Sequence, residues 1–178
     1  MKTLKTSMII GVFFVLVTGT LAHFLYDWSG ENPIVGLFTP VNESIWEHMK
    51  LLFFPMLLYS AVLVLRFKDK EPCMMCSLCF GSLLGTFLIP VLYYTYTAVL
   101  HRDFFVLDIA TFLISAVAAF YAAYRLTQSC RLQSYATLIY ALTAVLFFCF
   151  MLFTYDPPSL GLFNDPEIHT FSLHSVEI

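Results

Sequence analysis

The stretch PVNESIWEHMK, residues 40–50, concentrates ionisable side chains directly before a long apolar run. Glu43, Glu47, His48 and Lys50 all lie within this short segment. Carboxylate and imidazole groups bind divalent metal ions, and they also act as general acids and bases. The segment is therefore a candidate for one wall of a polar site.

A second group of ionisable residues lies near the end of the preceding apolar run. His23 and Asp27 are four residues apart, so they share one face of a helix, and Tyr26 is adjacent. Asp108 lies at a similar depth, close to the start of a later apolar run. Ionisable groups at membrane depth are costly and usually face the bundle interior with partners. We therefore expect these groups to line one outward-facing polar pocket.

Three functions are compatible with such a pocket. The first is binding of a divalent metal such as zinc, or of a small polar ligand, with metal-dependent catalysis as an extension. The second is transport, in which the same groups bind a solute or relay protons. The third is a structural membrane protein in which these groups only satisfy one another. No HExxH or similarly strict ligand motif separates the three.

Each function draws on the same candidate residues. Tyr94 is included because it follows Pro90, and a proline inside a spanning helix often borders a cavity. The expected metal ligands are His23, Glu43, Glu47 and His48, and the acid–base candidates are His48, Glu47, His23 and Asp27. The full expected lining is His23, Tyr26, Asp27, Asn42, Glu43, Trp46, Glu47, His48, Lys50, Tyr94 and Asp108.

Composition indicates the elements that must position these residues. The chain has 178 residues, of which 60% are hydrophobic and 12% charged, and its mean hydropathy is +0.81. A soluble domain is about half apolar and about a quarter charged. A spanning helix needs about 20 apolar residues, and the sequence supplies five such runs: 8–28, 45–67, 74–100, 104–124 and 133–155. The prediction is an all-α membrane bundle of one domain over residues 1–155, followed by a polar tail, 156–178.

Basic residues predict the orientation of the bundle. Of the nine lysines and arginines, only Lys50 and Arg102 fall on the side opposite the N-terminus. Because basic residues favour the cytoplasmic side, we expect the N-terminus inside and the C-terminus outside, in a multi-pass protein of the inner membrane. The lipid bilayer is then the main partner, and nucleic acid is excluded for this acidic chain.

Local structure offers its own explanation for part of the opening segment. Ser44-Ile-Trp-Glu47 fits the capping-box pattern that begins a helix, and Asn42 is a competing cap. Glu47 and Lys50 are spaced to form an ion pair on one helical face. Neither explanation accounts for His48.

Small residues at helical spacing predict close helix packing in the membrane. They are Gly81, Gly85, Ser115, Ala118, Ala119, Ala122 and Ala123. Packing within the bundle is one outcome, and the seam of a homo-oligomer is the other.

The cysteines are grouped on the side predicted to be cytoplasmic. Cys73, Cys76 and Cys79 are three residues apart, and Cys130 lies in another loop on that side. Such spacing occurs in metal and cluster sites, while buried cysteine is also an ordinary apolar residue. A reducing compartment argues against structural disulfides. In the tail, Asp165, Glu167 and His169 are possible additional ligands if the tail covers the pocket.

The runs HFLYDW, GLFTPVNESIWEHMKLLFFPMLL and PPSLGLFNDP resemble a family of small bacterial membrane proteins, DUF6512. The resemblance covers the first two predicted spans and the start of the tail. It implies a bacterial inner-membrane setting, and it implies no reaction.

Overall fold

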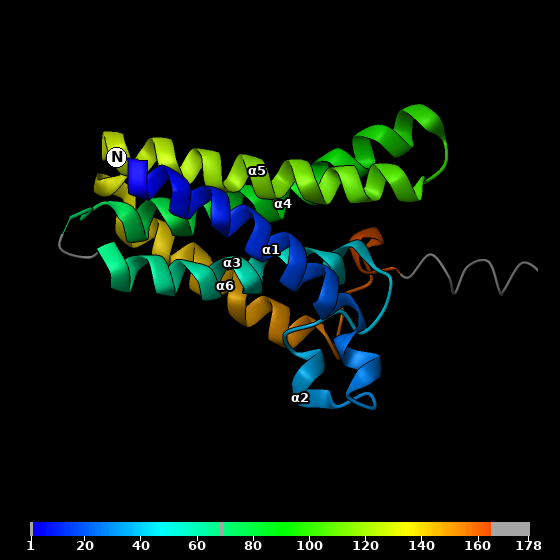
Figure 1. Ribbon diagram of the computed structural model, residues 1–178. Helices are drawn as coiled ribbons and strands as arrows, with labels where there is room; N and C mark the ends of the chain where they lie inside the picture. Colours follow the sequence, from blue (N-terminus) through cyan, green and yellow to red (C-terminus); the bar gives the residue numbers. More distant parts are fainter. Residues whose placement is uncertain (1, 68–69, 165–178) are drawn as a thin grey trace, which may run out of the picture.

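The computed structural model describes residues 2–67 and 70–164, and within this part the chain is helical, without strands. Five helices are long and apolar enough to cross a membrane, as predicted. They are α1 (Lys2–Trp28), α3 (Ile45–Phe67), α4 (Met74–Leu100), α5 (Phe105–Ser129) and α6 (Ala136–Phe153) (Figure 1). Three short elements complete the fold: α2 (Pro33–Gly36) and the 3-10 turns η1 (Gln133–Tyr135) and η2 (Gly161–Phe163).

Two helices extend beyond the apolar runs that predicted them. α1 begins six residues before the predicted start at residue 8, and α5 continues to Ser129 rather than ending at 124. Lysine and arginine are good helix formers, so the helices continue through Lys5 and Arg125. An apolar run measures the thickness of the hydrocarbon layer, whereas helix length is set by where the backbone is capped.

The helices pack as an antiparallel bundle with α4 near its centre. α4 packs against α5, α3 and α6, while α1 packs against α3 and α5. A Cβ added at Gly81 would lie 2.6 Å from the carbonyl oxygen of Ala119, and one at Gly85 would lie 2.8 Å from the Cβ of Ala119. The small residues of α4 therefore face α5 of the same chain.

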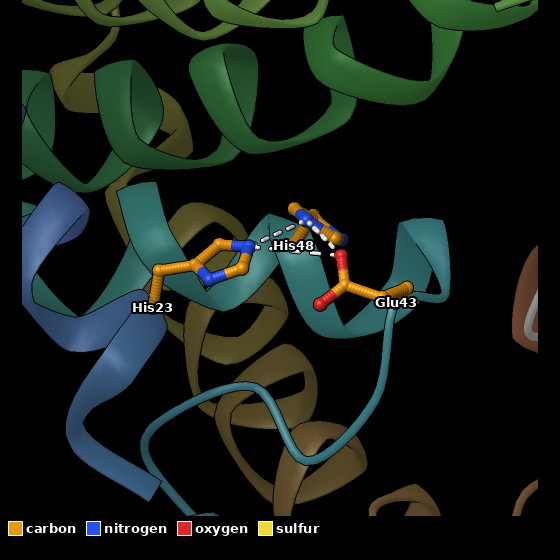
Figure 2. A group of neighbouring side chains, drawn as sticks. All are labelled: His23, Glu43 and His48. Atoms are coloured by element: carbon orange, nitrogen blue, oxygen red, sulfur yellow. Dashed lines mark hydrogen bonds and ion pairs between the residues drawn. The ribbon is translucent and has the colours of Figure 1, made fainter. Parts of the chain in front are cut away.

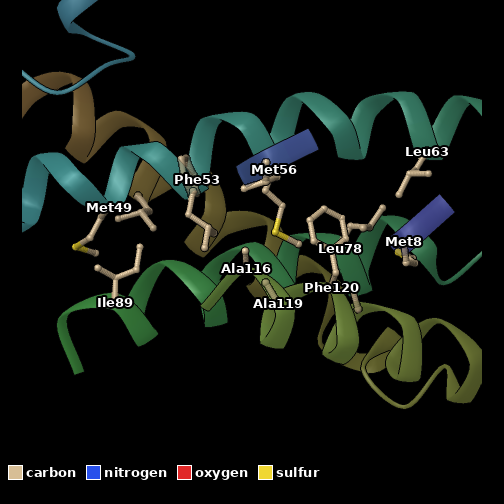
Figure 3. Close-up of a cluster of buried hydrophobic side chains, with 14 of the residues drawn as sticks. Met8, Met49, Phe53, Met56, Leu63, Leu78, Ile89, Ala116, Ala119 and Phe120 are labelled. Carbon is tan, nitrogen blue, oxygen red and sulfur yellow. The ribbon is translucent and has the colours of Figure 1, made fainter. Parts of the chain in front are cut away.

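Buried apolar side chains fill the space between α1, α3, α4 and α5 (Figure 3). Phe53 and Met56 of α3 belong to this core together with Ala116 and Phe120 of α5. Other large apolar side chains, including Phe13, Leu65 and Phe105, remain exposed on the outside. In water this surface would be unfavourable, so it fits contact with lipid chains.

One expectation about the cysteines is wrong. Cys73 and Cys130 form a disulfide, so they are not unpaired thiols. The topology explains the pairing, because α4 and α5 are antiparallel neighbours and the start of one lies beside the end of the other. Cys76, Cys79 and Cys149 are free.

The other end of the bundle gathers the segments that carry the candidate site. The end of α1, the loop with α2, the start of α3 and the end of α6 lie together there (Figure 1). Phe163 of η2 packs on Trp46 of α3, with ring centroids 4.7 Å apart. The tail ligands considered above, Asp165, Glu167 and His169, lie outside the described residues.

Candidate metal centre

Three side chains from separate segments converge at this end of the bundle. His23 comes from the last part of α1, Glu43 from the loop before α3, and His48 from the first turn of α3 (Figure 2). The two histidine Nε2 atoms are 3.2 Å apart. The Glu43 Oε2 atom lies 3.4 Å from the His48 Nε2 and 3.7 Å from the His23 Nε2. Within the part of the chain that the structure describes, this is the only group of three or more potential metal ligands.

The orientation of His48 is fixed by the backbone of its own helix. Its Nδ1 atom lies 2.9 Å from the carbonyl oxygen of Ser44, one turn earlier. A carbonyl oxygen only accepts hydrogen bonds, so the Nδ1 of His48 is the donor. In neutral His48 the Nε2 atom therefore carries the lone pair, and it points toward His23 and Glu43. Metal-bound histidines commonly have this arrangement, with the other ring nitrogen donating to a carbonyl.

The start of α3 places Ser44 and Glu43 for this role. The backbone N–H of Glu47 donates to the hydroxyl of Ser44 at 3.3 Å, which is the capping bond that the sequence predicts. The side chain of Asn42 accepts from the backbone N–H of Ser44 at 3.0 Å. Glu43 therefore lies just outside the helix, where its carboxylate can turn toward the histidines.

The charge state of Glu43 follows from its neighbours. The interaction with His23 lowers the pKa of Glu43 below its usual value, and the positive charges of protonated His48 and His23 act in the same direction. Partial burial opposes this shift without cancelling it. The side chains of His23, His48 and Glu43 remain 29%, 28% and 42% exposed. The cluster thus offers an ionised carboxylate and two imidazoles that water can reach.

A buried ion pair anchors the loop that carries Glu43. The ammonium group of Lys50 donates to the Glu47 carboxylate at 2.6 Å, and the two side chains are 0% and 2% exposed. Lys50 also donates to the carbonyls of Gly36 and Thr39, and to the hydroxyl of Thr154 at the end of α6. The Glu47 carboxylate in turn accepts from the backbone N–H of Val41 at 3.0 Å. Residues 36–41 are thereby held against α3 and α6.

The remaining candidate residues do not belong to the three-residue cluster. Glu47 is committed to Lys50, and the carboxylate of Asp108 accepts a hydrogen bond from Tyr96 between α4 and α5. Trp46 is buried among Phe150, Phe153 and Phe163, and Tyr94 is exposed on α4. Tyr26 packs near Gly36, and Asp27 belongs to no group of potential metal ligands among the described residues.

The sequence did not predict two hydrogen-bond acceptors in this region, one for His48 and one for Lys50. The carbonyl of Ser44, which orients His48, is a backbone group and leaves no mark in the sequence. Thr154, which accepts from Lys50, is a polar residue at the end of the most apolar helix. Its position at a span end was the available signal, but nothing local links it to Lys50 across more than one hundred residues of chain.

Comparison with known proteins adds a family and no activity. No curated protein and no solved structure matches the chain. A family of unknown function, DUF6512, matches residues 1–171. The match includes all five long helices and every residue of the His23, Glu43 and His48 cluster. The chain therefore belongs to the DUF6512 family.

Proposed function

We propose that the protein binds one divalent transition-metal ion, of the zinc type, through His23, Glu43 and His48. Tetrahedral zinc with bonds of about 2.0–2.1 Å requires ligand atoms separated by about 3.3 Å. The three atom pairs of the cluster are separated by 3.2, 3.4 and 3.7 Å. This agreement is the observation that carries the proposal. Two imidazoles and one carboxylate favour zinc or a similar ion over magnesium or calcium, which prefer oxygen ligands.

The ligand set further suggests a catalytic role. Structural zinc sites use four protein ligands, whereas catalytic sites use three and leave a fourth position for water. Two histidines and one glutamate form a ligand set found in zinc hydrolases. An ion held here would lower the pKa of its bound water and supply a nucleophile at neutral pH. We therefore assign the centre to metal-dependent hydrolysis at the membrane surface.

The distribution of ionisable residues favours this function over transport. Residues 6–22, 51–65, 74–100, 109–124 and 133–155 contain no Asp, Glu, His, Lys or Arg. A proton relay across the membrane uses a chain of such groups. The sequence places them only near the ends of the spans, which suits a site at one end of the bundle.

Metal analysis tests the proposal. Wild-type protein purified in detergent and dialysed against Zn²⁺ is expected to retain about one ion per chain, as three convergent ligands require. His48→Ala is expected to weaken zinc binding by about a hundredfold or more, because it removes one of three ligands. His101→Asn is the matched control, since His101 is exposed, has a left-handed backbone and lies outside the cluster. Equal binding by wild type and His48→Ala would contradict the proposal.

Zinc affinity is also expected to depend on pH in a specific direction. A protonated imidazole has no lone pair for a metal, and imidazole groups usually titrate near pH 6.5. The lowered pKa of Glu43 keeps its carboxylate ionised through that range. Lowering the pH from 7.5 to 5.5 should therefore weaken binding by roughly tenfold to a hundredfold, as protons compete for the histidines. If calorimetry shows a loss only near pH 4, carboxylates alone hold the ion and the histidine assignment fails.

The open coordination position has a separate test. Co²⁺ replaces zinc in such sites and absorbs visible light, so its spectrum reports on its ligands. Azide added to Co²⁺-loaded protein should change the spectrum by displacing the bound water. An unchanged spectrum at saturating azide would indicate a closed centre and argue against catalysis.

A further inference from the structure

The end of the bundle opposite the metal centre carries a disulfide in an unexpected position. Cys73 is the residue just before α4, and Cys130 is the residue just after α5. Their bond joins two loops that are separated by 57 residues in the chain. It is independent of the His23, Glu43 and His48 cluster.

The basic residues and the disulfide at this end of the bundle indicate different environments. Seven of the nine basic residues lie on this side of the predicted spans: Lys2, Lys5, Arg66, Lys68, Lys70, Arg125 and Arg131. That distribution predicts a cytoplasmic location. Disulfides of cytoplasmic proteins are usually transient, and they serve catalysis or redox sensing. A disulfide that opens and closes satisfies both observations.

The two cysteines differ in their exposure to water. Cys73 is buried, with 6% of the residue exposed, whereas Cys130 is exposed. An external thiolate is therefore expected to attack the bond from the side of Cys130 rather than from the side of Cys73. The leaving thiolate would form on Cys73 at the N-terminus of α4, where the helix dipole favours negative charge.

The surroundings keep the two cysteines together when the bond is open. Cys76, one turn further along α4, is a free thiol that is 1% exposed. Its sulfur donates a hydrogen bond to the carbonyl of Leu132, in the loop that follows Cys130, at 3.4 Å. This contact holds the loop against α4 without any covalent bond. The disulfide can then re-form between the same partners.

We propose that Cys73 and Cys130 form a reversible thiol–disulfide exchange site for thiols of the surrounding aqueous phase. A thiolate attacks the Cys130 sulfur, the Cys73–Cys130 bond breaks, and Cys73 leaves as a thiolate. A second thiolate attacks the external sulfur of the mixed disulfide and releases Cys130. The two external thiols become one disulfide, and their two protons and two electrons reside on Cys73 and Cys130. The reverse sequence oxidises the pair.

Glutathione tests this mechanism on the folded chain. Wild-type protein in detergent is incubated with mixtures of reduced and oxidised glutathione, and its free thiols are then counted by mass spectrometry after alkylation. We expect the pair to open and close reversibly while circular dichroism stays unchanged. Thioredoxin in a parallel series distinguishes the source of electrons: faster reduction by thioredoxin indicates a protein dithiol, and faster reduction by glutathione indicates the small-molecule pool. Reduction by neither contradicts the proposal.

Two single variants test which sulfur is attacked. In Cys73→Ser the exposed Cys130 should acquire glutathione at least tenfold faster than Cys73 does in Cys130→Ser. Cys149→Ser is the control, because Cys149 is a free cysteine of α6 and lies outside the pair. Equal labelling of the two variants, or a wild-type disulfide that opens only on unfolding, would show that the bond is merely structural.

Discussion

Replacing Lys50 with methionine should destabilise the bundle by about 3–5 kcal/mol, which is the usual result of removing one partner from a buried ion pair. The ammonium group is fully buried, and its three N–H groups are shared among four acceptors from three segments of the chain. Among the described residues, its removal leaves the Glu47 carboxylate with one hydrogen-bond donor, the backbone N–H of Val41. Unfolding by SDS in mixed micelles measures the loss as a lower midpoint.

Two further variants distinguish the loss of stability caused by breaking the ion pair from the general effect of a substitution. Lys70→Met removes an exposed lysine and is expected to change stability by no more than about 0.5 kcal/mol. The double variant Glu47→Gln with Lys50→Met should recover much of the loss, because no buried charge remains unpaired. If the double variant is as unstable as the two single variants summed, the residues are not coupled.

The Lys50→Met variant also tests how residues 36–41 support the metal centre. Lys50 and Glu47 hold residues 36–41, and Glu43 follows two residues later. The folded fraction of the Lys50→Met variant should therefore bind zinc more weakly than wild type, although Lys50 contacts none of the three proposed ligands. The sequence reveals the ion pair through its spacing, but the loop it restrains is visible only in three dimensions.

The apolar runs predicted the five spans because membrane helices must satisfy their backbone internally and bury apolar side chains in lipid. The same reasoning could not separate the roles of Glu43 and Glu47, which are four residues apart and would share one face of a continuous helix. Glu43 precedes the helix, so its side chain does not follow the helix face of Glu47 and turns to His23 and His48. Glu47 lies one turn later and points to Lys50. A helical wheel assumes that both residues are helical, and only one is.

Depth in the membrane proved a weaker guide than the direction a side chain faces. Asp108 was expected in the pocket because it lies near the start of α5, at the same end of its span as His23 and His48. Its carboxylate instead accepts from Tyr96 of α4, the helix that packs most closely against α5. The disulfide was missed for a related reason, since pairing depends on which helix ends are neighbours. Neither the contact of Asp108 with Tyr96 nor the bond between Cys73 and Cys130 can be predicted from the spacing of residues within one segment.

The contact between α4 and α5 yields the last prediction. Gly81→Ala places a Cβ 2.6 Å from the carbonyl oxygen of Ala119, so the helices must separate, at a cost of about 1–3 kcal/mol. Helix propensity alone favours alanine over glycine by about 1 kcal/mol, so the expected sign is opposite to propensity. Gly161→Ala is the control, because nothing lies within 4 Å of the added atom. SDS unfolding midpoints at several protein concentrations provide the measurement. A loss independent of concentration locates the contact within one chain, whereas a loss that deepens on dilution would place Gly81 at a seam between copies.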